Sequence, residues 1–397
     1  MKTPLLRRNR KRKRRNMKRK GILLGLVLVL GLCGCGEKKQ SLVDSEQELE
    51  KAEPVTELPE ELSLNTETEQ VEPVDKHPYD LNICYTGDIS LAEDAITTYN
   101  LENSGGKIEE CIALEFIQQM QEADVTVINN EFQFSSQGYP LEGKMYTFRG
   151  NPERVETLKE LGVDLACLAN NHVYDFGQAA MLDTFDTLQK AGIPYMGAGH
   201  NLEEAMTPVY MELQGKKVAF VAASRAEKFR MTPQATETEP GILRCYDTEL
   251  FLQEIQEAKK NADLVIAYVH WGTEHSTVLE EAQTSTGKEY IDAGADVVVG
   301  AHSHCLQGIE YYKGKPILYS LGNFWFDEYT EKTVLLKLHF YGDDDEQGLT
   351  VQLVPGLQTG GKTCYLSQQE EQRALYDYME AISVNASVDD QGFVYEK

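Results

Sequence analysis

The 397-residue chain is 41% hydrophobic, so it is long and apolar enough for one large domain or two small ones. Of its 38 basic residues, 12 precede Cys35 in a stretch without acidic residues, which leaves 26 basic against 64 acidic residues and a net charge of −38. This balance excludes nonspecific nucleic-acid binding, because a polyanion would be repelled. A local metal site could still bind an anion, since salt screens surface fields beyond about 10 Å.

The N-terminus has the layout of an export signal. The basic stretch RRNRKRKRRNMKRK precedes the apolar run GILLGLVLVLGL, which is followed by CGCG. This order is typical of a secretory signal peptide, and the apolar run is shorter than the about 20 residues that a membrane-spanning helix needs. The alternative is a basic arm for nucleic acid, which the directly adjoining apolar run disfavours.

The stretch Leu32-Cys33-Gly34-Cys35 resembles a bacterial lipoprotein box, in which the cysteine after a small residue is lipidated and becomes the mature N-terminus. Cys35 fits that position, whereas Cys33 follows a leucine. We therefore expect residues 1–35 to be a lipoprotein signal peptide and Cys35 to carry the lipid. The protein would then be exported and anchored to the outer face of the bacterial cell membrane.

Residues 36–78 are expected to form a disordered acidic tether. From Glu37 to Lys76 there are 13 acidic and 4 basic residues and no aromatic residue. Such a stretch cannot bury enough surface to offset the entropy lost on ordering.

Short apolar runs that end in polar residues or glycine alternate with amphipathic segments from Tyr79 onward. The amphipathic segments NPERVETLKELG and QAAMLDTFDTLQKAG have helical periodicity, and Gly192 closes the second. Alternating strands and helices predict an α/β domain with largely parallel pairing over residues 79–345. The apolar runs are LNICYTGD, ADVTVINNE, VDLACLANNH, KVAFVAAS, ADLVIAYVHWG, ADVVVGAHSH and KPILYSLGN.

The later part of the chain has a different pattern. The segments TVLLKLHFYG and LTVQLVPG alternate like antiparallel strands, and residues 346–397 are expected to close the domain as a C-terminal strand and tail. Residues 227–247 lack periodicity and are expected to form a long loop or lid. The six cysteines after Cys35 show no disulfide framework or CxxC pair, which favours free thiols.

Polar residues gather just after the apolar runs, where open α/β sheets bind ligands. Taken singly, each has a structural alternative: Asp88 could cap a turn, Glu131 could be a solvated charge, and His270 could be a local donor. Together they favour a metal site, because carboxylates and imidazoles at one edge are costly unless paired or metal-bound. The set comprises Asp88, Glu131, Asn171, His172, His270, Glu274, His302 and His304.

His302 and His304 stand two positions apart at the end of an apolar run. In an extended segment, residues two apart point to the same side. Both imidazoles are therefore expected to approach one metal cluster, with Ser303 facing away.

The ordered motifs GD, NNE, ANNHVYDFG, GAGHNLEEA, HWGTE, GAHSHCLQG and SLGNFWFD resemble those of the CapA family of poly-γ-glutamate capsule proteins, in the calcineurin-like metallophosphoesterase superfamily. The resemblance covers about Asp80 to Asp327. It implies a β-sandwich of two mixed sheets flanked by helices, with two divalent metal ions at the sheet edge, for which Mn, Fe or Zn are suitable. By this resemblance, Asp88 and His304 would hold the first metal, Glu131 would bridge, Asn171, His270 and His302 would hold the second, and His172, oriented by Asp175, would act on the reacting group.

Two positions depart from the wider superfamily. Its opening Asp-x-His pattern is Asp88-Ile89-Ser90 here, and its usual bridging Asp is Glu131, as in CapA-like proteins. The serine would leave the first metal site without its histidine.

Three further residues are candidates beside the metal ligands. Glu274 is expected to orient His270 or to act as a general base. Arg149 could bind an anionic substrate bidentately or form a surface salt bridge. Asn323 is a candidate substrate-side residue, expected to hold its loop through hydrogen bonds to backbone.

The preferred hypothesis is a lipid-anchored, metallophosphoesterase-like hydrolase or transferase that acts in the synthesis or processing of an anionic surface polymer such as poly-γ-glutamate. Its partners would be that polymer or a phosphoester, the membrane through the lipid anchor, and membrane synthase subunits, with no nucleic acid. The main alternative is a non-catalytic subunit that binds polymer or a synthase. Ser90 favours it, and it is opposed by the joint presence of Asn171, His172, His270, His302 and His304. A secreted phosphatase for small nutrients is a third hypothesis.

Overall fold

The computed structural model describes residues 78–227, 231–343 and 346–397. The predicted signal peptide, the lipidation site Cys35 and the acidic tether up to residue 77 lie outside these residues. Within the described ranges, no helix combines the length and the apolar character needed to cross a bilayer.

The larger of two main sheets has ten strands and mixes parallel and antiparallel pairing. In spatial order they are β19 (Ala386–Val388), β20 (Phe393–Glu396), β17 (Gln347–Thr359), β16 (Glu331–Gly342), β1 (Tyr79–Ile89), β2 (Val125–Asn130), β5 (Leu165–Cys167) and β6 (Tyr195–Met196), with β15 (Asn323–Trp325) beside β1 and β18 (Lys362–Tyr365) beside β17. β1, β2, β5 and β6 run parallel, whereas β16 is antiparallel to both β1 and β17. The predicted parallel core and antiparallel final strands are confirmed.

The second sheet has six strands. In spatial order they are β13 (Ile309–Tyr312), β14 (Lys315–Leu318), β12 (Val297–Ala301), β11 (Leu264–His270), β9 (Lys216–Ser224) and β8 (Val209–Leu213). The four strands from β14 to β9 are parallel, and the two outer strands pair antiparallel. Two short pairs complete the strands: β3 (Gln133–Phe134) with β4 (Arg149–Gly150), and β7 (Ala198–Gly199) with β10 (Gly241–Ile242).

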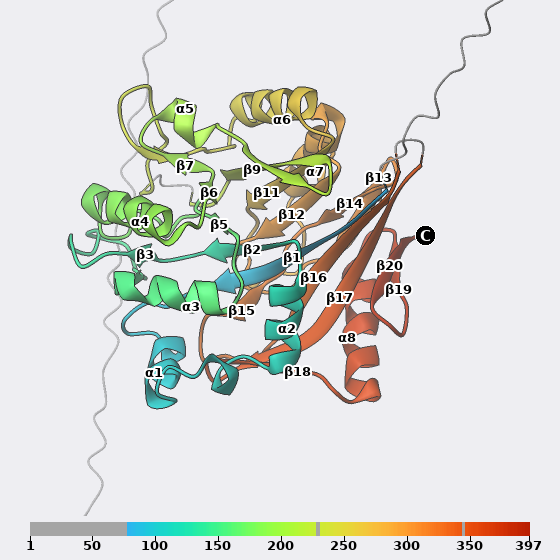
Figure 1. Cartoon of the computed structure of the whole chain (residues 1–397), viewed down its shortest axis with the longest axis horizontal. Helices are drawn as coiled ribbons and strands as arrows, with labels where there is room; N and C mark the ends of the chain where they lie inside the picture. The colour runs from blue at the N-terminus through green and yellow to red at the C-terminus, as the bar shows by residue number, and fades with distance from the viewer. Residues whose placement is uncertain (1–77, 228–230, 344–345) are drawn as a thin grey trace, which may run out of the picture. The chain divides into compact units, whose positions relative to one another are not determined.

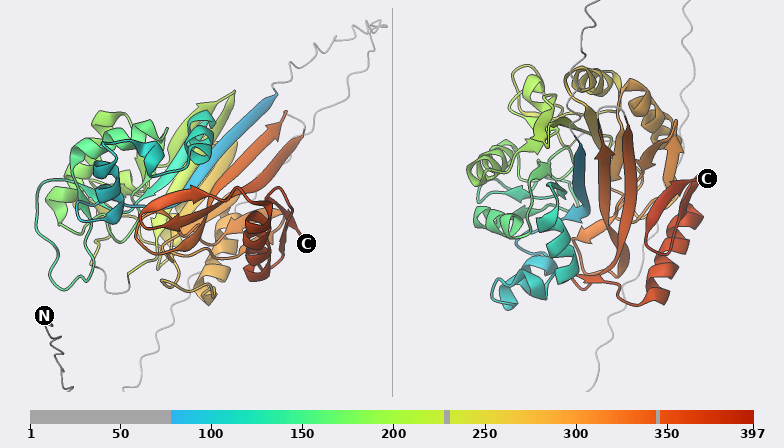
Figure 2. Two further views of the ribbon diagram at one scale, coloured as in Figure 1. Left: turned by 90° about the horizontal axis from the view of Figure 1, so that it is seen from below. Right: turned by 45° about the vertical axis from the view of Figure 1, so that its right-hand side comes forward.

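The two sheets pack face to face and helices cover their outer faces, as Figures 1 and 2 show. α2 (Leu114–Glu122), α3 (Val155–Glu160) and α4 (Gln178–Ala191) lie on the larger sheet, and α6 (Glu249–Asn261) and α7 (Glu281–Ala293) lie on the smaller one. The predicted α/β sandwich of two mixed sheets flanked by helices is therefore confirmed. The remaining helices are α1 (Ile96–Asn103), α5 (Leu202–Ala205), α8 (Gln369–Ile382) and the 3₁₀ turns Ile108–Glu110 and Pro152–Arg154.

The central strands are apolar throughout because both of their faces are buried. In β11, Ile266 and Tyr268 enter the core between the sheets. Val265 and Ala267 face the opposite side of the sheet and pack under α6 and α7. Helix ends follow local signals: Gly192 ends α4 with φ 77°, a left-handed conformation that glycine adopts without cost.

The last 50 or so residues are built into the larger sheet rather than added to it. β17 pairs along its length with β16, and β20 pairs with β17. The six cysteines of the described ranges are free, four of them buried, as the absence of a disulfide pattern predicts.

Candidate metal centre

The polar residues predicted from the strand ends lie together at one edge of the sandwich. Asp88 is the second-to-last residue of β1, Glu131 follows β2, His270 ends β11, and His302 follows β12 directly. Because parallel strands of both sheets end at this edge, their carboxyl ends bring these side chains close together. Asp88, Glu131 and His270 are fully buried, and His302 and His304 are nearly so.

The residues form two groups that share Glu131. One contains Glu131, His270 and His302, and the other contains Asp88, Glu131 and His304; within each group, potential ligand atoms lie within 4.8 Å of one another. Glu131 Oε1 is 3.7 Å from His270 Nε2 and 3.8 Å from His304 Nε2. These distances exceed hydrogen-bond length but suit two atoms bound about 2.1 Å from one ion. The structure thus brings the candidate ligands together on two sides of Glu131.

Unpartnered polar atoms provide a test of whether this set fits metal ions. Glu131 Oε1 and His302 Nδ1 are buried and have no hydrogen-bond partner among the described residues. Burial and the adjacent Asp88 carboxylate raise the pKa of Glu131 well above its ordinary value. Such atoms are costly to bury unless a cation neutralises them. The donor set of carboxylates and imidazoles therefore fits divalent metal ions.

The three ligand histidines differ in charge. Burial lowers the pKa of both His270 and His302 well below the ordinary value, which keeps them neutral. Burial also acts to lower the pKa of His304, but the carboxylates of Glu131 and Asp88 outweigh it and raise that pKa to about 10. Neutral imidazoles are the metal-binding form, so His270 and His302 are ready to bind, whereas His304 must release a proton.

An asparagine network, which the sequence analysis did not identify, holds the carboxylates in place. Asn129 Nδ2 donates to Asp88 Oδ1 at 2.7 Å and to Glu131 Oε2 at 2.9 Å. Asn170 Nδ2 donates in turn to Asn129 Oδ1, and Asn170 Oδ1 accepts from the backbone N–H of His172. The Asn-Asn pairs, one at the end of β2 and one after β5, were the available signal. The network fixes the orientation of both carboxylates.

His172 and Asp175 form the predicted pair. His172 Nδ1 lies 2.7 Å from Asp175 Oδ2, and its Nε2 faces Glu131 Oε1 at 3.8 Å. Asn171 Oδ1 lies 2.7 Å from His270 Nε2, so the amide also points to the centre. Phe148 packs on the His172 ring with a centroid distance of 4.4 Å. Burial lowers the pKa of the His172 imidazole, so the ring is uncharged near neutral pH.

The expected reason for the convergence of His302 and His304 is wrong. Both residues have positive φ, 92° and 55°, so the segment is a tight turn and not an extended strand end. The turn still directs both imidazoles to the centre, and Ser303 Oγ donates to Cys305 O instead. Position 300, shortly before the turn, requires glycine, because a Cβ atom there would lie 2.1 Å from Tyr319 O. Positive φ values such as those of His302 and His304 are uncommon outside glycine and often mark functional sites.

Two predicted roles change in the structure. Asn323 Oδ1 contacts His304 Nδ1 at 2.8 Å and its amide donates to Asp327, so its hydrogen bonds orient a ligand side chain and do not go to backbone. Glu274 is exposed, and the partners of the two His270 ring nitrogens in the described residues are Asn129 and Asn171. The expected contact of Glu274 with His270 is therefore not formed.

Arg149 is also engaged elsewhere. Its guanidinium donates to Gln137 O and Gly138 O and stacks over Phe176 at 4.3 Å. The residue fastens the loop between β3 and β4, and a nearby carboxylate, that of Glu93, is 4.0 Å away. The structure thus favours a structural role over bidentate binding of a substrate.

In its described residues, 227 and 231–247, the predicted loop is a loop apart from β10, as expected, and it is fastened beside the centre. Thr232 Oγ1 donates to Asn171 O at 2.8 Å. Arg244 donates to the carbonyls of Thr232, Ala226 and Glu227. These contacts hold the loop against the segment that carries His172.

Ser90 stands where the Asp-x-His pattern described above would place a histidine. It is buried, and its Oγ has no hydrogen-bond partner among the described residues. Because this position is a serine, the group around Asp88 has one imidazole, that of His304, beside the carboxylates of Asp88 and Glu131.

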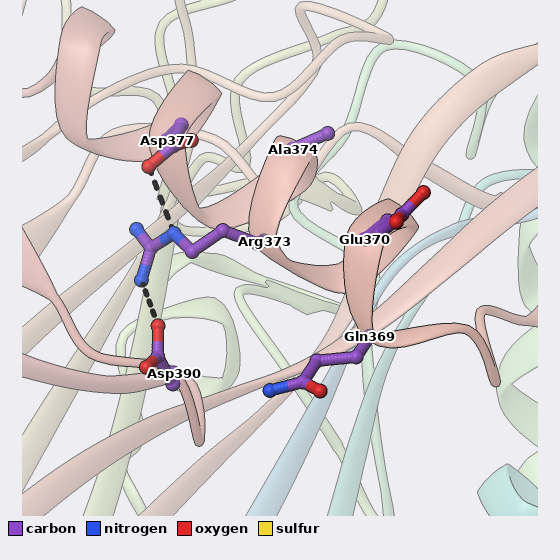
Figure 3. Close-up of a pocket in the computed structure, with 6 residues that line it drawn as sticks. All are labelled: Gln369, Glu370, Arg373, Ala374, Asp377 and Asp390. Atoms are coloured by element: carbon purple, nitrogen blue, oxygen red, sulfur yellow. Dashed lines mark hydrogen bonds and ion pairs between the residues drawn. The ribbon is translucent and has the colours of Figure 1, made fainter.

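A hollow of about 460 Å³ over α8 is unrelated to this centre (Figure 3). Its cation, Arg373, donates to Asp377 at 2.8 Å and to Asp390 at 3.0 Å. These carboxylates already neutralise the guanidinium, and no histidine lines the hollow, so it offers no set of candidate metal ligands like that at the strand ends.

Comparisons with known proteins agree with the sequence motifs. Residues 82–328 match the family of the bacterial capsule synthesis protein PGA_cap. The capsule biosynthesis protein CapA of Bacillus anthracis is 37% identical over 194 residues, 47% of this chain and 46% of that protein. The PGA biosynthesis protein CapA of Bacillus subtilis is 35% identical over 205 residues, 51% of this chain and 53% of that protein. The chain thus spans about half the length of these curated relatives.

A solved structure, an NAD nucleotidase from Haemophilus influenzae, aligns over 79% of this chain and 65% of that one. The TM-score is 0.40 and the identity 12%.

Proposed function

The chain belongs to the bacterial capsule synthesis protein family PGA_cap, and from this premise we propose that it is a metal-dependent hydrolase or transferase acting on an anionic surface polymer such as poly-γ-glutamate. The observation that supports this proposal is the buried Glu131 carboxylate, shared by two ligand groups with imidazoles on either side. A subunit that only binds polymer would have little need for such a costly arrangement.

Two divalent ions held by these residues would polarise a phosphoester or amide-like carbonyl and stabilise charge on its oxygen. Asp88 and His304 would bind on one side of Glu131, and His270, His302 and the Asn171 amide oxygen on the other. Asn129 keeps both carboxylates turned toward the centre. The buried position of the ligands excludes bulk water and strengthens their electrostatic interactions.

His172 would move the proton. Its Nδ1–H donates to Asp175, which leaves Nε2 facing the centre as a proton acceptor. Since burial lowers its pKa, the imidazole is unprotonated near neutral pH and can take a proton from a nucleophile, then return it to a leaving oxygen. The aromatic ring of Phe148 fixes its orientation.

A second candidate function rests on Ser90. Because serine stands where the superfamily has a histidine, the Asp88 side has two carboxylates and one imidazole. A protein with one weak site could act as a non-catalytic accessory subunit that binds polymer or a membrane synthase.

Location and attachment are part of the proposal. We infer export from the N-terminal signal pattern and a lipid anchor at Cys35, which would hold the domain at the outer face of the cell membrane. The acidic residues 36–78 would set its reach from the bilayer. Radiolabelled palmitate incorporation that a Cys35→Ala variant loses would support the anchor, whereas unchanged labelling would contradict it.

The test of the function is metal content per chain, followed by turnover of a generic phosphodiester and of a γ-glutamyl peptide. The wild type is compared with a His302→Ala, His304→Ala double variant. Two ions and turnover, both lost in the variant, are expected for the enzyme. A metal-loaded wild type that turns over neither substrate would favour the accessory subunit.

A further inference from the structure

Lys144 is a buried cation beside the metal centre that the sequence analysis did not single out. Its side chain is 8% exposed, and its Nζ lies 2.7 Å from Asp175 Oδ1 and 3.2 Å from Glu227 Oε1. It also donates to the backbone carbonyl of Asn171. The contact with the carbonyl is a hydrogen bond and the two contacts with carboxylates are ion pairs, so the buried ammonium charge is compensated by two carboxylates.

The three acceptors belong to two different segments that flank the centre. Asn171 and Asp175 follow β5, and Glu227 follows β9 of the other sheet. Lys144 itself lies on a third segment, the loop between β3 and β4. The lysine therefore joins three chain segments from both sheets at one point.

Further contacts converge on the same acceptors. Asp175 Oδ2 accepts from the backbone N–H of Phe148 at 2.6 Å, four residues beyond Lys144. Thr232 Oγ1 donates to the same Asn171 carbonyl, and the backbone N–H of Thr232 donates to Glu227 Oε2 at 2.6 Å. These contacts surround the short segment that carries the Asn171 amide and His172.

We propose that Lys144 is a positioning residue for the metal centre: by holding the Asn171 carbonyl and the Asp175 carboxylate, it fixes the Asn171 amide oxygen toward His270 and the His172 ring toward Glu131. This inference rests on the proposed metal binding, and it does not require turnover. Truncating a lysine whose buried ammonium has this many charged and polar acceptors is costly in free energy, because its partners are left unpaired.

The experiment is a Co²⁺ titration of the full chain, followed by visible absorbance, for the wild type and four single variants. Lys144→Met should weaken one binding step by about 10- to 100-fold, as is usual when a partner of a ligand is removed. Lys144→Arg should recover most of the loss because it keeps the charge. Glu227→Gln, which alters one acceptor of three, should weaken the same step less. Lys190→Met, on an exposed ion pair with Asp186, should change nothing.

A double-mutant cycle separates positioning from general destabilisation. If Lys144 acts through Asn171, then Lys144→Met should weaken Co²⁺ binding by less than about twofold in an Asn171→Ala background. Should the two losses multiply instead, or should Lys144→Met bind Co²⁺ like the wild type, the inference is overturned. If Lys144→Met does not fold, Glu227→Gln takes its place in the Co²⁺ titration and in the double-mutant cycle with Asn171→Ala, and Lys144→Arg is titrated beside it.

Turnover of a phosphodiester is measured in parallel. A wild type that binds two Co²⁺ ions without turnover would contradict the proposed enzyme and leave the Lys144 comparison decisive. A wild type that binds no Co²⁺ would overturn both proposals.

Discussion

The two sheets contribute different chemistry to the same edge. The larger sheet supplies the carboxylates and amides, with Asp88 at the end of β1, Glu131 after β2 and Asn171 after β5. The smaller sheet supplies imidazoles, from His270 at the end of β11 and from the turn after β12. Neither sheet alone presents a complete ligand group, because both groups combine a carboxylate from one sheet with an imidazole from the other. The centre therefore depends on the packing of the sandwich.

Glu131→Gln should have the largest effect, because this carboxylate is common to both groups. For the proposed centre of two ions, we expect Glu131→Gln to lose both, whereas His302→Ala, on the smaller sheet, should retain about one. Elemental analysis of the purified variants measures this directly. Equal metal content in Glu131→Gln and the wild type would refute a bridging role.

Asn129→Ala tests the larger sheet without removing a ligand. Its amide holds both carboxylates, so we expect metal affinity to fall by about 10- to 100-fold. Isothermal titration with Mn²⁺ measures the loss, and Asn261→Ala, whose amide contacts Glu257 on α6, is the matched control. Unchanged affinity would mean that packing alone orients the carboxylates.

Asn323→Ala tests the imidazole side. Its amide oxygen contacts His304 Nδ1, so we expect about tenfold weaker binding at the Asp88 group, with the His270 and His302 group unaffected. A two-step Co²⁺ titration distinguishes the steps. Weakening of both steps would show that Asn323 acts on the whole edge.

Glu254 on α6 sharpens the comparison because it is a buried carboxyl away from the ligand groups. Burial raises its pKa well above the ordinary value of 4.5, and Oε2 has no hydrogen-bond partner in the described residues. The folded protein therefore retains this proton, and stability falls as pH rises above the ordinary pKa toward the raised one. Glu254→Gln should remove that loss.

The expected gain for Glu254→Gln is about 1–3 kcal/mol at neutral pH and close to zero near the ordinary pKa of the carboxyl. Thermal unfolding of the variant and the wild type, from near the ordinary carboxyl pKa up to neutral pH, measures this gain in stability. Metal binding should stay at the wild-type level, in contrast to Glu131→Gln. A pH-independent difference between Glu254→Gln and the wild type would contradict the titration of Glu254.

The sequence predicted much of the fold and indicated residues of the candidate metal centre. The apolar runs and their polar ends placed the central strands, and the same ends identified Asp88, Glu131, His270, His302 and His304. Local patterns sufficed because strand burial and strand termination are encoded over a few neighbouring residues. The partners of Arg149 could not be predicted for the opposite reason, since Gln137 O and Gly138 O are placed by the course of a loop.

By itself, the sequence determined that this is an α/β chain of the capsule synthesis protein family with buried carboxylates and imidazoles at its strand ends. The tertiary structure alone decided that Asn129, held by Asn170, donates to the Asp88 and Glu131 carboxylates, and that a turn with positive φ directs His302 and His304. The physical reason is that hydrophobic periodicity is local, whereas hydrogen bonds and ion pairs join residues distant in the chain, such as Asn129 with Asn170. Those contacts exist only once the strands have assembled into sheets.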